Sequence, residues 1–88
     1  MMEELKYPVF RKYPHNRTFF KVISSDTFEE LQLVGNNFSI HHIKAKILPD
    51  RNFIADLTYD YKLNWVEITE QEYEEKLAYC KKNLKQFG

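Results

Sequence analysis

The side chains that could perform redox, metal or nucleophilic chemistry are few in this chain of 88 residues. Cys80 is the only cysteine, which excludes an intrachain disulfide and a zinc site of the multi-cysteine kind. The other soft ligands are His15, His41 and His42. Adjacent residues of a strand point to opposite faces, so His41 and His42 cannot hold one ion without a bulge. Since glycine-flanked serines and Gly-rich phosphate loops are also lacking, we expect no metal site, no cofactor and no catalytic residue set.

One short motif combines carboxylates with a lysine. Pro49 and Asp50, followed by Asp60, Tyr61 and Lys62, resemble the PD…DxK signature of a large nuclease superfamily. The resemblance implies carboxylates that hold magnesium and a lysine that steadies the attacking water. The surrounding pattern gives these residues a simpler interpretation. Asp50 caps a short helix, while Asp60 and Lys62 fall at a helix end or in a loop rather than on a strand.

Cations and aromatic rings are interleaved over residues 6–21, a stretch without any acidic residue. Stacking rings beside cations hold single-stranded nucleic acid, at about 1–3 kcal/mol for each stacked base. The candidate nucleic-acid-binding residues are Arg11, Lys12, Arg17, Lys21, Tyr13, Phe19 and Lys44. Such a site requires the cations to share one sheet face with exposed rings, and Glu29 or Glu30 on that face would weaken it. The alternative is a solvated strand face with its rings in the core.

Aromatic residues make up 16% of the chain, which is more than a thin core readily hides. Half-exposed Tyr and Trp side chains dominate the hot spots of protein interfaces. The candidate interface residues are Tyr59, Tyr61, Trp65 and Tyr79. Trp65 alone is also explained by packing under the last helix. An exposed edge strand offers a second docking mode, by strand addition or by homodimer pairing.

Alternating, β-rich stretches predict an antiparallel meander of three to four strands within about 6–47. The predicted strands are 6–13, 18–24, 28–34 and 38–47, with short helices as the rival interpretation of the last two. Pro8 suits an edge strand, and Gly35 with Asn36 predicts a hairpin turn. The stretch 18–24 is apolar on both parities, so both of its faces should be covered. Parity slips at His41 and His42, which indicates a bulge.

Two helices and a possible short strand follow the meander. A short helix at about 50–58 is capped by Asp50, and the possible strand is 64–68. The C-terminal helix, 70–86, is capped by Thr69 in a capping box with Glu72. Its apolar stripe consists of Tyr73, Leu77, Cys80 and Leu84. This pattern predicts an α+β fold in which the C-terminal helix packs on one sheet face; both helices can share that face and leave aromatics exposed on the other.

Residues 1–88 therefore read as a single small globular domain. The formal net charge is +0, so no overall electrostatic attraction draws the chain toward nucleic acid or a membrane. Met1 to Lys6 lacks the apolar run of a secretory signal, and no apolar stretch is long enough to span a bilayer, so we expect a cytoplasmic protein. The predicted function is a non-enzymatic interaction module that binds a protein partner or itself through an aromatic surface or a sheet edge. A small protein that binds single-stranded nucleic acid through strands 6–21 is the alternative, and an enzyme without a recognisable motif comes third.

Overall fold

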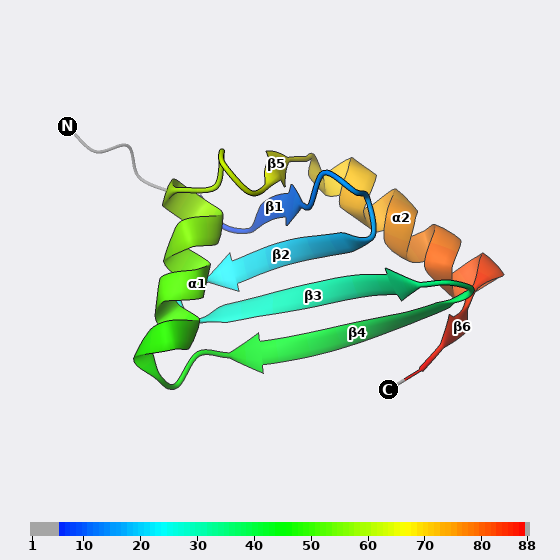
Figure 1. Cartoon of the computed structure of the whole chain (residues 1–88), viewed down its shortest axis with the longest axis horizontal. Coiled ribbons are helices and arrows are strands. Elements are labelled where there is room, and N and C mark those ends of the chain that lie inside the picture. The colour runs from blue at the N-terminus through cyan, green and yellow to red at the C-terminus, as the bar shows by residue number, and fades with distance from the viewer. Residues whose placement is uncertain (1–5, 88) are drawn as a thin grey trace.

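The computed structural model describes residues 6–87 and confirms the α+β fold (Figure 1). Its elements are β1 (Val9–Lys12), β2 (Thr18–Ser24), β3 (Thr27–Val34), β4 (Asn37–Lys44), α1 (Leu48–Tyr59), β5 (Val66–Glu67), α2 (Glu70–Asn83) and β6 (Lys85–Gln86). The sequence predicts no secretory signal at the start, and residues 1–5 of that segment lie outside the described residues. Within 6–87, the helices are too short or too polar to cross a membrane.

The strands form one sheet in the order β5-β1-β2-β3-β4-β6. The predicted antiparallel meander is β1 to β4, each strand paired with the next along the chain. Short strands extend it at both sides: β5 pairs antiparallel with β1, and β6 pairs parallel with β4. Figure 1 shows α1 standing across one end of the strands and α2 running from β5 toward β6.

The two helices pack on opposite faces of the sheet, so the expectation that they share one face is wrong. The reason lies in β2, where two consecutive residues, Phe19 and Phe20, are both fully buried. Phe19 belongs to the cluster under α2, and Phe20 belongs to the cluster under α1. Successive strand residues point to opposite faces, so an apolar strand of both parities needs a cover on each side. The predicted covering of both faces of 18–24 is thus confirmed.

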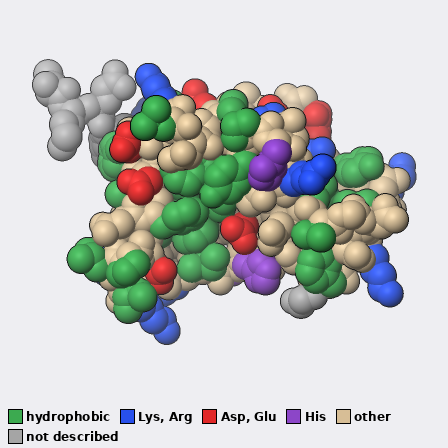
Figure 2. All heavy atoms as spheres, viewed as in Figure 1, with side chains coloured by type: hydrophobic (Ala, Val, Ile, Leu, Met, Phe, Trp, Pro, Cys, Tyr) green, Lys and Arg blue, Asp and Glu red, His purple; other side chains and the backbone are tan. Residues whose placement is uncertain are grey.

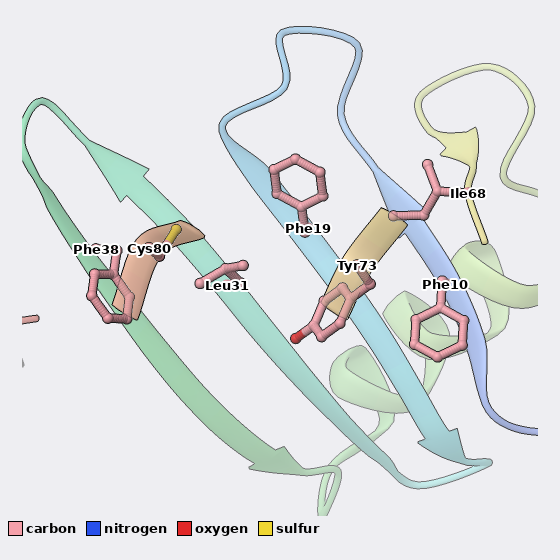
Figure 3. Packing of buried hydrophobic residues seen from close by; sticks show 7 residues of the cluster. All are labelled: Phe10, Phe19, Leu31, Phe38, Ile68, Tyr73 and Cys80. Atoms are coloured by element: carbon pink, nitrogen blue, oxygen red, sulfur yellow. The ribbon is translucent and has the colours of Figure 1, made fainter. Parts of the chain in front are cut away.

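The α2 side of the sheet holds one compact cluster (Figure 3). Sheet residues Phe10, Phe19, Leu31 and Phe38, with Ile68, lie beneath Tyr73 and Cys80 of α2. The predicted stripe is confirmed, since Leu77 and Leu84 pack against the same cluster. Thr69 is the helix cap: its Oγ1 accepts a 3.1 Å hydrogen bond from the Glu72 N–H. The Glu72 carboxylate accepts instead from Lys12 Nζ at 2.9 Å, which fixes the start of α2 to β1.

The helix α2 ends earlier than the predicted boundary at 86. Its last residue is Asn83, and Leu84 is already extended, with φ −116° and ψ 161°. The Lys85 N–H then donates to the Asn36 carbonyl at 3.0 Å, which starts β6. Backbone bonds to the β3–β4 hairpin therefore compete successfully with a further helical turn.

The α1 side holds an aromatic cluster around Phe20, Phe53 and Trp65, with Tyr13 at its border. The Phe53 and Trp65 rings meet edge to face, with centroids 5.7 Å apart. The helix α1 begins at Leu48, and its N-cap is Ile47, which makes no side-chain cap bond. The prediction that Asp50 caps this helix is wrong. Pro49 in the first turn needs no N–H partner, so the helix starts earlier and Asp50 lies inside that turn.

Two further local predictions have different outcomes. The hairpin is confirmed: Gly35 has φ +60°, and Val34 pairs with Asn37 across the two-residue loop. The bulge at His41 and His42 is wrong, because the β3–β4 register runs without a shift from Thr27↔Lys44 to Val34↔Asn37. The parity slip has another cause. Ile40 packs on the α2 side and Ile43 on the α1 side, so β4 needs apolar residues of both parities.

A candidate interaction edge

The long strand β4 carries half of its backbone groups on the outer side of the sheet. Because Val34 pairs with Asn37 next to a two-residue loop, Asn37 and every second residue after it bond inward to β3. The Phe38 carbonyl confirms this alternation, since it accepts a 2.9 Å hydrogen bond from Phe87 N–H on the outer side. The backbone groups of Ile40, His42 and Lys44 therefore point outward as well.

The short strand β6 covers only the start of this outer side. It pairs with Asn37 and Phe38 and goes no further. Within residues 6–87, the outward N–H and C=O groups of Ile40, His42 and Lys44 have no main-chain partner. We call this segment, Ile40–Lys44, the β4 edge. Unpaired strand edges are templates for another strand, so the β4 edge can accept an extended chain.

The opposite side of the sheet offers less room. Pro8 suggested β1 as the edge strand, and this is wrong: β5 pairs with β1 at Arg11 and Lys12. Pro8 precedes the first paired residue of β1, so its missing N–H costs the sheet no hydrogen bond. The outer strand on this side is β5 itself, which has only two residues, Val66–Glu67. Of the two outer edges that residues 6–87 form, the β4 edge is therefore the longer one without a partner.

On the α2 face, His42 ends a short polar chain. Its Nδ1 lies 3.5 Å from Glu29 Oε2, and Glu29 Oε1 accepts a 2.8 Å hydrogen bond from the Tyr73 hydroxyl. Burial raises the pKa of Tyr73, and the hydrogen bond to Glu29 raises it further. The phenol thus stays a donor at neutral pH, while the His42 side chain, 70% exposed, remains accessible beside the edge.

The remaining side chains of the edge are apolar or basic. Ile40 and Ile43 are half-buried on opposite faces, and His41 is exposed opposite Glu30. Lys44 is exposed at the end of the strand. From Asn37 to Pro49 the sequence contains no acidic residue. The edge therefore presents backbone donors and acceptors between aliphatic and basic side chains.

The structure divides the candidate nucleic-acid-binding residues between both faces. Arg11 points to the α1 side and is 3% exposed. Its Nε donates to the Leu57 carbonyl at 2.9 Å, and its guanidinium carbon lies 3.8 Å from the centre of the Tyr61 ring. Burial lowers the pKa of Arg11, against the opposing effects of Tyr61 and Glu67. The guanidinium group holds α1 to β1 and is not free to contact phosphate.

Other members of that set lie on the α2 face or in a loop. Lys12, Lys21 and Lys44 share the α2 face, where Lys12 is paired with Glu72 and Lys21 is opposite Glu29. Phe19 is 1% exposed, so it offers no ring for stacking. Tyr13 packs against Trp65 on the α1 side, and Arg17 is exposed in the β1–β2 loop. Figure 2 shows Lys and Arg side chains scattered over the visible face and its rim rather than gathered in a patch.

The candidate interface aromatics do not form one surface either. Trp65 is 7% exposed and packs in the α1-side cluster. Tyr61 is half-buried under Arg11. Tyr59 is 69% exposed at the end of α1, whereas Tyr79 is 51% exposed on α2, on the other face of the sheet. Two of the four rings are thus accessible, and they face different directions.

The soft ligands and the nuclease-like residues lie far apart. Among residues 6–87, no three His, Cys, Asp or Glu side chains converge to hold a metal ion. His41 and His42 are on opposite faces, and Cys80 is buried under α2. Asp50 and Asp60 stand at opposite ends of α1, about 15 Å apart along a straight helix, so they cannot share an ion.

Sequence reasoning anticipated an edge strand but not its identity. The signal for β4 was present: the last strand of a meander has a free outer side unless a later segment returns to cover it. The sequence predicts helix for the β6 segment, which in the structure covers Asn37 and Phe38, so the length of the free stretch does not follow from the sequence. No protein-family model, curated protein or solved structure matches this chain.

Proposed function

We propose that this domain is a non-enzymatic interaction module whose β4 edge binds an extended segment of another protein chain, supplied by a partner or by a second copy. The observation that carries the proposal is the free edge itself: Ile40, His42 and Lys44 direct backbone groups outward without a main-chain partner in residues 6–87. Each of these residues contributes one donor and one acceptor. Each hydrogen bond to an added strand contributes about 0.5–1.5 kcal/mol net.

The surroundings of the edge favour a protein segment over nucleic acid. An added strand places its side chains about 4.5–5.5 Å from those of β4, alternately on the two faces. It would meet Ile40 on one face and Ile43 on the other, both half-buried. Nucleic acid instead needs cations and exposed rings on a common face, and Arg11 and Phe19 are both buried.

The proposal is tested with a substitution that blocks only the outer side of β4. In His42→Pro the lost N–H is one that points outward, so the β3–β4 ladder keeps its bonds. His42→Ala removes the same side chain and leaves the N–H, which makes it the matched control. His41→Pro deletes an inward N–H and should destabilise the fold, which verifies the assigned alternation.

The measurement is selection from a phage-displayed library of random peptides, together with sedimentation of the protein alone. We expect the wild type and His42→Ala either to bind selected peptides or to form a dimer. His42→Pro should lose this binding or dimerisation, while its circular dichroism spectrum stays native. The β4 edge would be refuted as the binding surface if the wild type is a monomer and the selected peptides bind His42→Pro as tightly as they bind the wild type.

A further inference from the structure

We infer that the segment bound at the β4 edge is acidic, an inference that rests on the proposed function. A strand added to an edge touches the edge strand first. Its side chains lie about 4.5–5.5 Å from those of β4, whereas β3 is one strand further away, at about 9–10 Å. The charges that decide which segment binds are therefore those of β4 and of the residues that follow it.

The side chains there that can carry a charge are all basic. His41, His42, Lys44 and Lys46 are the ionisable residues between Asn37 and Pro49, and none is acidic. The acids of β3 stand beside the two histidines: Glu29 lies 3.5 Å from His42, and Glu30 pairs in register with His41. Both lysines are exposed, and neither forms an ion pair within residues 6–87.

One acid that interacts with Lys44 through its charge, Asp26, is already engaged. Asp26 acts on Lys44 through charge alone, while its carboxylate accepts hydrogen bonds from Ser24 at 2.8 Å and Thr27 at 2.9 Å. An incoming carboxylate opposite Lys44 therefore gains a partner without displacing an existing ion pair. Opposite charges that face each other across two strands stabilise the pairing.

A second copy of the chain fits the same edge less well. The free segment Ile40–Lys44 is centred on His42, so a two-fold symmetric antiparallel pairing sets His42 against His42. In that register Lys44 of each copy lies opposite Ile40 and diagonal to His42 of the other. Basic side chains that face one another in this way gain no partner of opposite charge. Lysines on an edge strand also oppose edge-to-edge association in general. A segment with carboxylates opposite these lysines forms ion pairs with them and is not opposed in this way.

The edge also specifies where the acids should stand. Positions opposite Ile40 and Ile43 face half-buried aliphatic side chains, so aliphatic residues fit there. Positions opposite His41, His42 and Lys44 face ionisable side chains, so glutamate or aspartate fits there. The inferred partner is thus an extended acidic segment with aliphatic residues at two of these five positions.

The test uses two blocked seven-residue peptides. One carries valine and glutamate in this arrangement, and the other has lysine in place of every glutamate. Binding of each to the full chain is measured by fluorescence anisotropy at low and moderate salt. We expect the glutamate peptide to bind at least tenfold more tightly, with a difference that shrinks as salt screens the charges. Lys44→Glu should reduce or reverse the preference, and Lys62→Glu, a loop control, should leave it unchanged.

The outcomes separate this inference from the function on which it rests. Equal affinity for both peptides, lost in His42→Pro, would overturn the acidic preference and leave the strand-binding function standing. A wild-type dimer that His42→Pro disrupts, with neither peptide bound, would also overturn it in favour of a second copy. A monomer that binds neither peptide and selects none from the library would overturn both.

Discussion

The Tyr73 hydroxyl donates a 2.8 Å hydrogen bond to Glu29 Oε1 and so joins α2 to β3 across 44 residues of sequence. The Tyr73 side chain is fully buried, and hydrogen bonds to charged groups contribute about 1.5–3 kcal/mol. Tyr73→Phe keeps the ring in the α2-side cluster and removes only this bond. We expect it to lower the free energy of unfolding by about 1–2 kcal/mol, because Glu29 retains some access to water.

Urea denaturation followed by circular dichroism measures this loss. Tyr79→Phe is the matched control, since Tyr79 is 51% exposed and should tolerate the change. Equal stability of both variants would show that the Tyr73–Glu29 bond adds nothing to the packing of α2.

Arg11 is the second buried polar link, between β1 and α1. It donates from Nε to the Leu57 carbonyl and from Nη1 to the Phe10 carbonyl, each at 2.9 Å. Arg11→Lys keeps the charge but cannot span both carbonyls with a planar fork. We expect a loss of roughly 1–3 kcal/mol in unfolding free energy, since a buried acceptor is left unsatisfied.

Glu67→Gln is the control for Arg11. The Glu67 side chain is 67% exposed and lies 3.7 Å from Arg11 Nη1, and an exposed ion pair of this kind contributes at most about 1 kcal/mol. Thermal unfolding should therefore show a large effect for Arg11→Lys and a small one for Glu67→Gln. The reverse order would mean that the ion pair, not the carbonyl bonds, holds Arg11.

Asp26 should make the fold less stable in acid. Hydrogen bonds from Ser24 and Thr27 lower the pKa of Asp26 in the folded state. A carboxyl whose folded pKa lies below its unfolded value of about 3.9 adds stability above that value and loses it as pH falls toward the folded pKa. Stability should therefore fall as the pH drops below about 4, and the fall should be smaller in Asp26→Asn.

Ser24→Ala checks the cause assigned to the Asp26 shift. The Ser24 hydroxyl makes the largest contribution, so its removal should raise the folded pKa of Asp26 and shrink the acid-induced loss. Urea midpoints at pH 7 and pH 3 measure both effects. An identical pH dependence in wild type, Asp26→Asn and Ser24→Ala would contradict the account.

Cys80 should resist thiol reagents until the protein unfolds. The side chain is fully buried under α2, and burial raises its pKa against the opposing charge of Lys76, so the reactive thiolate is scarce. A coloured disulfide reagent at neutral pH should react with the native protein many times more slowly than with the protein in urea. Rapid labelling of the native protein would mean that α2 opens often enough to expose Cys80.

The sequence predicted those elements whose signals are local. Thr69 with the stripe from Tyr73 to Leu84 defines α2, because a cap and a 3.6-residue period need no distant partner. Gly35 defines the hairpin for a similar reason, since few other residues adopt its positive φ. The apolar residues of both parities in 18–24 also correctly indicated a strand covered on both faces.

Other features depended on partners far along the chain. Parity alone placed a bulge at His41 and His42, because it could not show that helices cover opposite faces and that each face takes its own apolar residues from β4. Likewise, Arg11 looked like a free cation by composition, and only the carbonyl of Leu57, 46 residues away, makes it a buried link.

By itself, then, the sequence predicted the meander and the C-terminal helix, and it contains no multi-cysteine motif and no glycine-rich motif. Tertiary structure alone decided which helix covers which face and that β6 returns to pair with Asn37 and Phe38. It also decided that, within residues 6–87, the outward backbone groups of Ile40, His42 and Lys44 have no main-chain partner. The physical reason is that propensity, caps and periodicity act over a few residues. Whether a strand edge is free depends on which distant segment pairs with that strand. Strands pair through backbone hydrogen bonds, so the side chains of the two strands do not reveal the pairing.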